Sequence, residues 1–277
     1  MLRAWSGGSG TPVLLCNGLG ASPSAWPAVV DTESGFQVVG WDHRGLGGSQ
    51  RPQDPARVRI EDHAADARAV LDAFGLESAI AVGWSLGVNV AFEVALEEPD
   101  RVDGVMAVAG VPGGSFSSLF GTLGVPRRMR APAGRLSSRL LPLVGPLLPL
   151  VTDGLQPWQA FLGPAVAQRS PQDAARLGAL TTVLREFAGH DWSWFRHLAV
   201  AVAEHAPLDL SPLSCPVTFL AGRYDTLVDA ADVRAAADGV PGARYREFSG
   251  GHFLPLEQPD AMLEELRRLA EVPAARV

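Results

Sequence analysis

The sequence predicts an α/β fold: a mainly parallel central sheet with helices on both faces and a mostly helical insertion between two of the strands. Three observations predict it. Short apolar runs alternate with helical patterns, one glycine-bounded serine motif joins such a run to such a helix, and about ninety residues interrupt the alternation. The length of 277 residues fits one such domain with an insertion better than two equal domains.

Each strand is expected where a short apolar or strand-like run occurs. These runs lie at residues 13–16, 37–41, 79–82, 104–108, 217–220 and 243–248. Helical patterns separate several of them, as at 60–74 and 88–96. In a parallel sheet of this kind, ligands bind beyond the C-terminal ends of the strands.

The insertion is expected to be a helical cap over these strand ends. It covers residues 112–205, which leaves residues 1–111 and 206–277 for the core. Proline, arginine, leucine and tryptophan dominate it, and the strand pattern resumes only at residue 217. Charge also separates the two parts, because the insertion has a net charge of +4 and the remainder −11.

Composition limits the partners. A net charge of −7 argues against nucleic acid, since phosphate binding needs a concentrated basic face. We expect no transmembrane segment, because no uninterrupted apolar run reaches about 18 residues. The first residues contain no apolar leader, so we expect a cytoplasmic protein. Cys16 and Cys215 are expected at opposite ends of the sheet, as free thiols. The oligomeric state stays open, a homo-oligomer included.

Residues 83–87 (GWSLG) are the first candidate for chemistry. Ser85 falls where an apolar run turns directly into a helical one, and the flanking glycines allow the backbones to approach closely. A serine hydroxyl is a weak nucleophile near neutral pH, so it needs a base within hydrogen-bond reach and a third group that orients the base.

His252 is the candidate base and Asp225 the candidate acid. Of the six histidines, only His252 lies in a glycine-flanked loop that follows a strand-like run and precedes a final helical pattern. Asp225 ends a short polar loop after another strand, and Asp229 is the fallback. The chain order of Ser85, Asp225 and His252 is that of serine hydrolases with this type of turn.

Residues 41–49 (WDHRGLGGS) resemble a D-x-R-G-x-G-x-S stretch of the α/β-hydrolase superfamily. Together with the motifs around Ser85, Asp225 and His252, they identify the chain as similar to the capped esterase and lipase-like branch of that superfamily. The place of Leu86 at a helix start predicts one backbone donor for an oxyanion. The resemblance implies a second donor, Leu19, in the loop 17–20. Members of this branch often have histidine where this chain has Asn17.

Three further residues have mainly structural interpretations. Asp42 and Arg44 are expected to fix the loop after their strand through hydrogen bonds and an ion pair. For Trp84, packing in the core and lining the substrate pocket beside the serine are both open.

The cap is expected to set the substrate. Its apolar residues could line a pocket or pack the cap on the core, and both interpretations stay open; they are residues 140–151, Trp158, Phe161, Trp192, Trp194 and Phe195. Arginines at 127, 128, 130, 135 and 139 could attract an anionic substrate or a membrane surface, and a solvated face is the simpler interpretation.

The resemblance therefore implies a serine hydrolase of small or medium carboxylic esters, without metal or cofactor, acting on a small-molecule substrate through an acyl-enzyme. Lactone, thioester and carbon–carbon bond hydrolysis, and perhydrolase or haloperoxidase activity, use the same triad and are not separated by sequence. An aspartate nucleophile is excluded by Ser85. A non-catalytic ligand receptor is the alternative of another class, and the intact trio argues against it.

Overall fold

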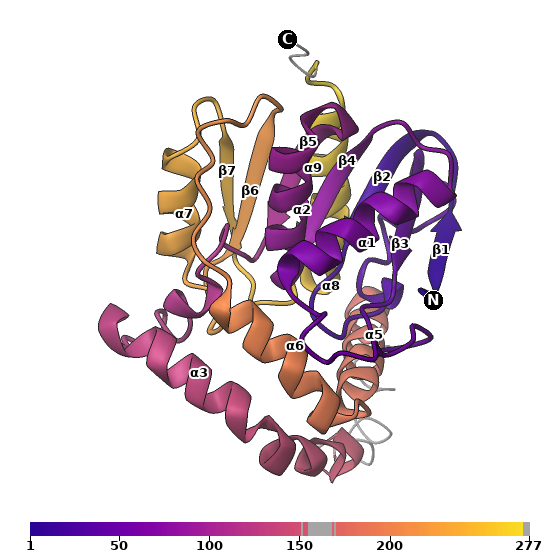
Figure 1. Ribbon diagram of the computed structural model, residues 1–277. Helices are drawn as coiled ribbons and strands as arrows, with labels where there is room; N and C mark the ends of the chain where they lie inside the picture. The colour runs from indigo at the N-terminus through magenta and orange to yellow at the C-terminus, as the bar shows by residue number, and fades with distance from the viewer. Residues whose placement is uncertain (151, 155–167, 169, 274–277) are drawn as a thin grey trace.

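The computed structural model describes residues 1–150, 152–154, 168 and 170–273 (Figure 1). Within them, seven strands form one sheet in the order β1-β3-β2-β4-β5-β6-β7. β1 pairs antiparallel with β3, and all other neighbouring strands pair parallel. The strands are β1 (Ala4–Gly7), β2 (Thr11–Cys16), β3 (Phe36–Trp41), β4 (Ala79–Trp84), β5 (Val102–Val108), β6 (Val217–Gly222) and β7 (Arg244–Phe248).

The predicted fold class is confirmed, and six of these strands coincide with the predicted runs. The edge strand β1 was not predicted, because its four residues, AWSG, are too few and too mixed to form an apolar run. Its Trp5 lies opposite Gly40 on β3, and a Cβ at Gly40 would stand 2.5 Å from the Trp5 ring. The bare backbone of Gly40 therefore makes room for the indole that covers this edge of the sheet.

Two hydrophobic layers enclose the sheet because successive strand residues point to opposite faces. Leu14 and Cys16 face the layer formed with α1 (Ile60–Ala73), α2 (Leu86–Glu97) and α7 (Ala230–Asp238). Val13 and Leu15 face the layer formed with α8 (Leu254–Glu257) and α9 (Pro259–Ala270). The central strands are buried on both faces, as in other parallel sheets with helices on each side.

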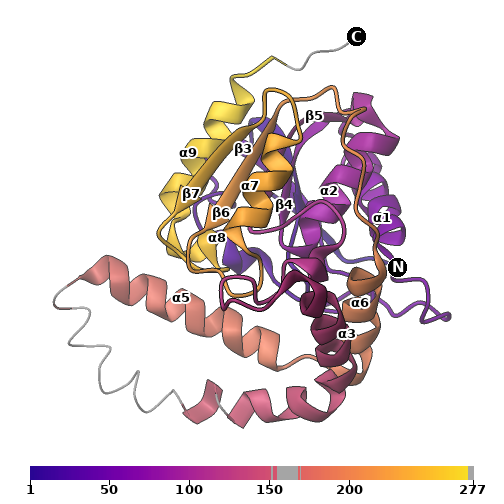
Figure 2. The same cartoon turned by 90° about the vertical axis from the view of Figure 1, so that its left-hand side faces the viewer.

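The described helices between β5 and β6 lie beyond the C-terminal ends of the parallel strands (Figures 1 and 2). These helices are α3 (Arg127–Val144), α5 (Pro171–Ala188) and α6 (Trp192–Glu204). The segment that contains them leaves and rejoins the sheet side by side, because the Gly114 N–H donates to the His205 carbonyl and the Leu208 N–H donates to the Pro112 carbonyl. Arg127 and Arg130 of α3 pair with Asp232 of α7.

The described residues of the apolar stretch 140–151 do not line the cavities that Ser85 borders. Leu143 and Leu150 are 72% and 70% exposed, which corrects the lining interpretation for these side chains. Trp192, Trp194 and Phe195 pack on two core residues, Leu46 and Val58, and Phe195 also lines a cavity that Ser85 borders. Trp158 and Phe161 lie outside the described residues. Among the described helices, none is long and apolar enough to cross a membrane.

Candidate active site

Ser85 lies on a sharp turn between β4 and α2. Its φ of 56° and ψ of −116° place it in a region that L-residues rarely adopt, at a cost of about 1–3 kcal/mol. The Ser85 N–H donates to the Val108 carbonyl on β5 and fixes the turn. A Cβ at Gly83 would stand 2.6 Å from the Gly87 carbonyl oxygen, and one at Gly87 would overlap the Cys16 carbonyl. The two glycines therefore allow β4, β2 and α2 to meet behind the serine.

A chain of hydrogen bonds joins Ser85, His252 and Asp225. His252 Nε2 is 3.0 Å from Ser85 Oγ, and its Nδ1 is 2.8 Å from Asp225 Oδ2. The other oxygen, Asp225 Oδ1, accepts from the N–H groups of Leu227 and Val228. Because a carboxylate only accepts, Nδ1 carries the proton and Nε2 presents its lone pair to the serine hydroxyl. The arrangement can therefore remove the hydroxyl proton.

Two hydrogen bonds that were not predicted from the sequence hold the loop that carries His252. Trp84 Nε1 donates to the His252 carbonyl at 2.9 Å, and Glu257 accepts from the Gly251 N–H at 2.5 Å. A Cβ at Gly222 would overlap the Gly251 carbonyl, so β6 and this loop touch through backbone alone. Trp84 is 3% exposed and packs in the core, and it also lines a cavity that Ser85 borders.

Leu86 and Leu19, the two residues predicted as backbone donors, line one cavity together with Ser85. Leu86 is the first residue of α2, where the first N–H groups lack a partner in the helix. In the part of the chain that the structure describes, neither the Leu19 N–H nor the Leu86 N–H donates a hydrogen bond. Asn17 stabilises the loop before Leu19: its Oδ1 accepts from Gly18 N–H and Trp26 Nε1.

Two apolar cavities meet at Ser85. The larger, about 300 Å³, is also lined by Trp84, His252, Phe253 and the α5 residues Val183, Leu184 and Phe187. The smaller, about 140 Å³, is also lined by Leu86, Gly110, Ser115, Leu119, Val202 and Val228. Leu19, Ser85 and Phe116 border both cavities. A molecule with two apolar groups on either side of a reactive centre fits this arrangement.

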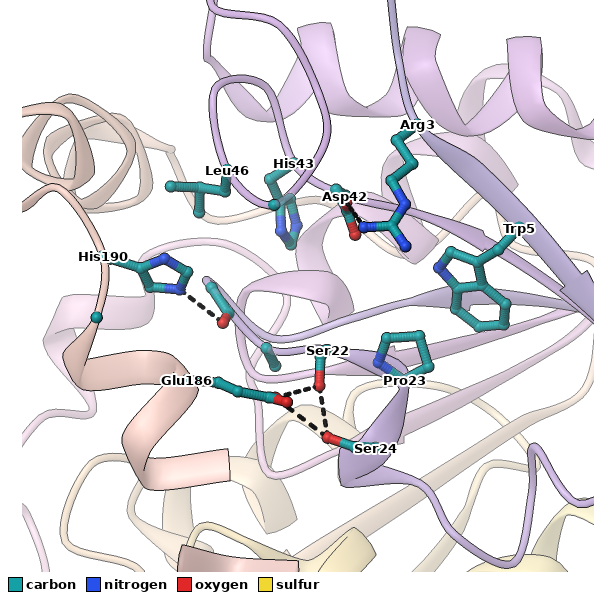
Figure 3. A pocket seen from close by; sticks show the side chains of 14 residues that line it. Arg3, Trp5, Ser22, Pro23, Ser24, Asp42, His43, Leu46, Glu186 and His190 are labelled. Carbon is teal, nitrogen blue, oxygen red and sulfur yellow. Dashed lines mark hydrogen bonds and ion pairs between the residues drawn. The ribbon is translucent and has the colours of Figure 1, made fainter. Parts of the chain in front are cut away.

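A third cavity of about 760 Å³ lies on the other side of the loop at 20–24 and is not lined by Ser85 (Figure 3). Figure 3 shows Glu186 of α5 accepting from Ser22 and Ser24, and His190 reaching the Gly20 carbonyl. These contacts tie α5 and the turn after it to the loop that carries Leu19. The position of that backbone donor therefore depends on the segment between β5 and β6.

The remaining predicted residues lie away from the serine. Asp42 accepts from the Gly48 N–H at 2.6 Å, and Arg44 pairs with Asp62 and Asp66 of α1, so both fix their loop as predicted. Asp229 accepts from the Ala231 N–H and begins α7. A separate set of metal-type ligands, including His205, lies beside α1 and α2.

Known proteins with the α/β-hydrolase fold are similar to this chain. A family profile described as "alpha/beta hydrolase fold" matches residues 11–135. RutD of Azorhizobium caulinodans, which bears the provisional name carbamate hydrolase, is 28% identical over 94% of this chain and 91% of its own. RutD of Caulobacter segnis is 36% identical, but the match spans only 41% of that protein. Rhodomycin D methylesterase DnrP of Streptomyces peucetius is 28% identical over 91% of this chain and 89% of its own.

Solved structures share the fold. The enol-lactonase from Burkholderia xenovorans LB400 superposes with a TM-score of 0.69 at 21% identity, covering 98% of this chain and 96% of that one. At this identity the likeness concerns the fold, and the chemistry must be argued from the residues.

Proposed function

We propose that this chain, which belongs to the α/β-hydrolase superfamily, is a serine hydrolase that cleaves carboxylic esters through an acyl-enzyme intermediate. One observation carries the proposal: Ser85, on a strained turn at the C-terminal end of β4, is hydrogen-bonded to His252, which is hydrogen-bonded to the buried Asp225. A receptor would not require this alignment, which argues for turnover over simple ligand capture.

In the first half-reaction, Ser85 Oγ attacks the ester carbonyl while His252 Nε2 takes the hydroxyl proton. The negative charge that develops on the carbonyl oxygen is stabilised by the N–H groups of Leu19 and Leu86. His252 then gives its proton to the departing alcohol. A water molecule repeats the sequence on the acyl-enzyme and releases the acid.

Asp225 keeps this histidine in the required tautomer. Its carboxylate is 1% exposed and accepts three hydrogen bonds, one from His252 and two from the backbone. It therefore stabilises the imidazolium that forms when His252 takes the serine proton.

We assign residues 112–205 the role of a cap and residues 1–111 and 206–277 that of the catalytic core. The support is the placement of α5 and α6 over the strand ends and their contribution to the cavity walls. Two backbone hydrogen bonds join the two crossing points, at 112–114 and 205–208. Such a cap would keep bulk water from the acyl-enzyme except through the cavities.

We assign the alcohol and acyl halves of the ester to the two cavities at Ser85. The departing alcohol must lie within reach of His252 Nε2, and His252 lines only the larger cavity. The smaller cavity is lined by Leu86, a proposed oxyanion donor, so it takes the acyl group. The proposed substrate is therefore an ester of a short acyl group with a bulky apolar alcohol. The names of similar proteins, which include a methylesterase, support ester-type chemistry without fixing this preference.

A fluorophosphonate probe tests the mechanism. The probe should phosphonylate Ser85 stoichiometrically, as shown by mass spectrometry of the peptide that contains residues 83–87. Ser85→Ala should lose labelling and lower kcat for aryl acetates by at least about 10³-fold. Ser137→Ala, on the exposed face of α3, is the matched control and should keep both. Undiminished turnover by Ser85→Ala would refute the proposal.

A further inference from the structure

A second cluster of reactive side chains lies away from Ser85, where the cap rejoins the core. Glu61 comes from the first turn of α1, Glu93 from α2, and His205 directly follows α6. One ligand atom from each lies within 4.8 Å of the other two. Three elements that are distant in sequence thus bring two carboxylates and an imidazole to one point.

The buried imidazole nitrogen of His205 is not satisfied by a hydrogen bond within the described residues. The His205 side chain is 6% exposed, and its Nε2 has no hydrogen-bond partner among the described residues. Nε2 stands 3.4 Å from Glu93 Oε1 without the geometry of a hydrogen bond. Leaving such a nitrogen buried and unpaired costs about 1–3 kcal/mol, so a missing partner is expected there.

The two carboxylates lack a basic partner as well. Among the described residues, no arginine nitrogen lies within 4 Å of Glu61 or Glu93, and Arg68 on α1 is engaged by Glu97 and Glu98. The cluster therefore brings two carboxylates without a close arginine to a buried imidazole nitrogen.

We propose that Glu61, Glu93 and His205 form a binding site for a divalent transition-metal ion, with Zn²⁺ as the best fit. Imidazole nitrogen and carboxylate oxygen are both protein ligands of zinc, and the imidazole favours it over magnesium or calcium. In a tetrahedral site with bonds of about 2.0–2.1 Å, neighbouring ligand atoms are about 3.3 Å apart. The 3.4 Å between His205 Nε2 and Glu93 Oε1 already has this spacing. Glu61 is exposed and free to close the remaining distance.

A cavity of about 270 Å³ opens beside the cluster and provides the access and the space that a bound ion needs. It is lined by Arg59, Ile60, Glu61, Ala201, Glu204 and His205. This space admits the ion and holds a water molecule as the fourth ligand. The ion would join the C-terminal end of α6 to α1 and α2. Because α6 also borders both cavities at Ser85, bound metal would hold the cap against the core.

Calorimetric titration of the chelator-treated full chain with ZnCl2 at pH 7.5 tests the site. We expect one ion per chain with a Kd below about 10 µM. At a free zinc concentration one hundred times Kd, Tm should rise by about 5 °C. His205→Gln and Glu93→Gln should weaken binding by about 100-fold, and Glu61→Gln by about 10-fold. Because Glu61 is exposed, its variant reports on binding even if a buried variant fails to fold.

Two histidine controls locate the ion. His197→Gln, on the same helix but outside the cluster, should keep the wild-type Kd within twofold. His252→Gln should keep it too, because His252 belongs to the catalytic trio. The proposal is overturned if no site binds Zn²⁺ below about 100 µM. It is also overturned if His205→Gln or Glu61→Gln binds as tightly as the wild type, or if His252→Gln abolishes binding. None of these readouts depends on ester hydrolysis.

Discussion

At the scale of single residues, Asp225 determines which nitrogen of His252 carries the proton. One of its oxygens accepts from two backbone N–H groups, and the other accepts from His252 Nδ1. An asparagine at this position must keep its carbonyl oxygen toward the two backbone donors. Its NH2 group would then face Nδ1, which would become the acceptor, and Nε2–H would point at Ser85.

Asp225→Asn is therefore expected to lower kcat for ester hydrolysis by about 10³–10⁴-fold, because Nε2 can no longer accept the serine proton. Its Tm should stay within a few degrees of the wild type, since both backbone hydrogen bonds remain. The matched control is Asp229→Asn, in which the side chain can still accept from Ala231 and does not touch His252. Equal activities of the two variants would contradict the assignment of Asp225.

At the scale of elements, the strand ends and a mostly helical insertion between two strands could be predicted from the sequence, and the contacts of that insertion could not. The apolar run before Ser85 and the helical run after it locate the turn, and the glycines at 83 and 87 mark the close approach that the structure shows. Loops that follow parallel strands meet at one edge of the sheet, so the positions of Ser85, Asp225 and His252 after three strands predicted that they lie close together.

The arrangement of this insertion depends on tertiary contacts that leave no local pattern in the sequence. Leu143 and Phe195 are equally apolar in the sequence, but the first is exposed and the second is buried against the core. Glu186 looks like any surface acid on a helix, yet it accepts from Ser22 and Ser24 far away in the chain. Hydrophobic periodicity in the sequence does not identify such long-range partners.

Different residues line the two cavities at Ser85, so substitutions can test the proposed substrate preference. α5 borders the larger cavity alone, through Leu184 among others, whereas Leu119 borders the smaller one alone. Benzyl acetate and methyl phenylacetate are isomers that exchange the bulky group between alcohol and acyl sides. We expect kcat/KM for benzyl acetate to be larger by about tenfold, since the phenyl ring then lies in the larger cavity.

Leu184→Trp should lower kcat/KM for benzyl acetate by about tenfold or more and leave ethyl acetate unaffected, because an indole would fill the alcohol side. Leu119→Trp should instead discriminate against butyrate relative to acetate esters. Steady-state kinetics with benzyl acetate, ethyl acetate and ethyl butyrate give both comparisons. If the two variants showed the opposite pattern, the alcohol and acyl cavities would have to be exchanged.

At the scale of the whole molecule, two buried histidines link stability to pH. His43 is 3% exposed and His63 is fully buried, with their ring centroids 5.0 Å apart. Burial, and then the charge of His190, lower the pKa of His43 from 6.5 to about 4. Burial, followed by His43 and Arg44, lowers the pKa of His63 well below its usual value. Asp66, whose carboxylate lies 3.7 Å from His63 Nδ1, has a raised pKa because it is buried.

A histidine whose pKa is lowered by folding binds protons more tightly in the unfolded chain. Its contribution to stability is therefore complete above pH 6.5 and is lost as the pH falls from 6.5 toward 4. For His43, a folded-state pKa of about 4 means a loss of about 2 kcal/mol between pH 7.5 and pH 5. Asp66 acts in the opposite sense, because the folded state takes up its proton more readily, so the histidine contribution must be isolated by substitution.

His43→Phe keeps an aromatic ring at this buried position and removes the titration. The free energy of unfolding, measured by urea denaturation, should fall less between pH 7.5 and pH 5 in this variant than in the wild type, by about 2 kcal/mol. His197→Gln serves as the control, because His197 is partly exposed and should change the pH dependence much less. The same pH dependence in wild type and His43→Phe would show that His43 becomes charged without unfolding. The cavity of Figure 3, which His43 lines, would then have to admit enough water to solvate the imidazolium.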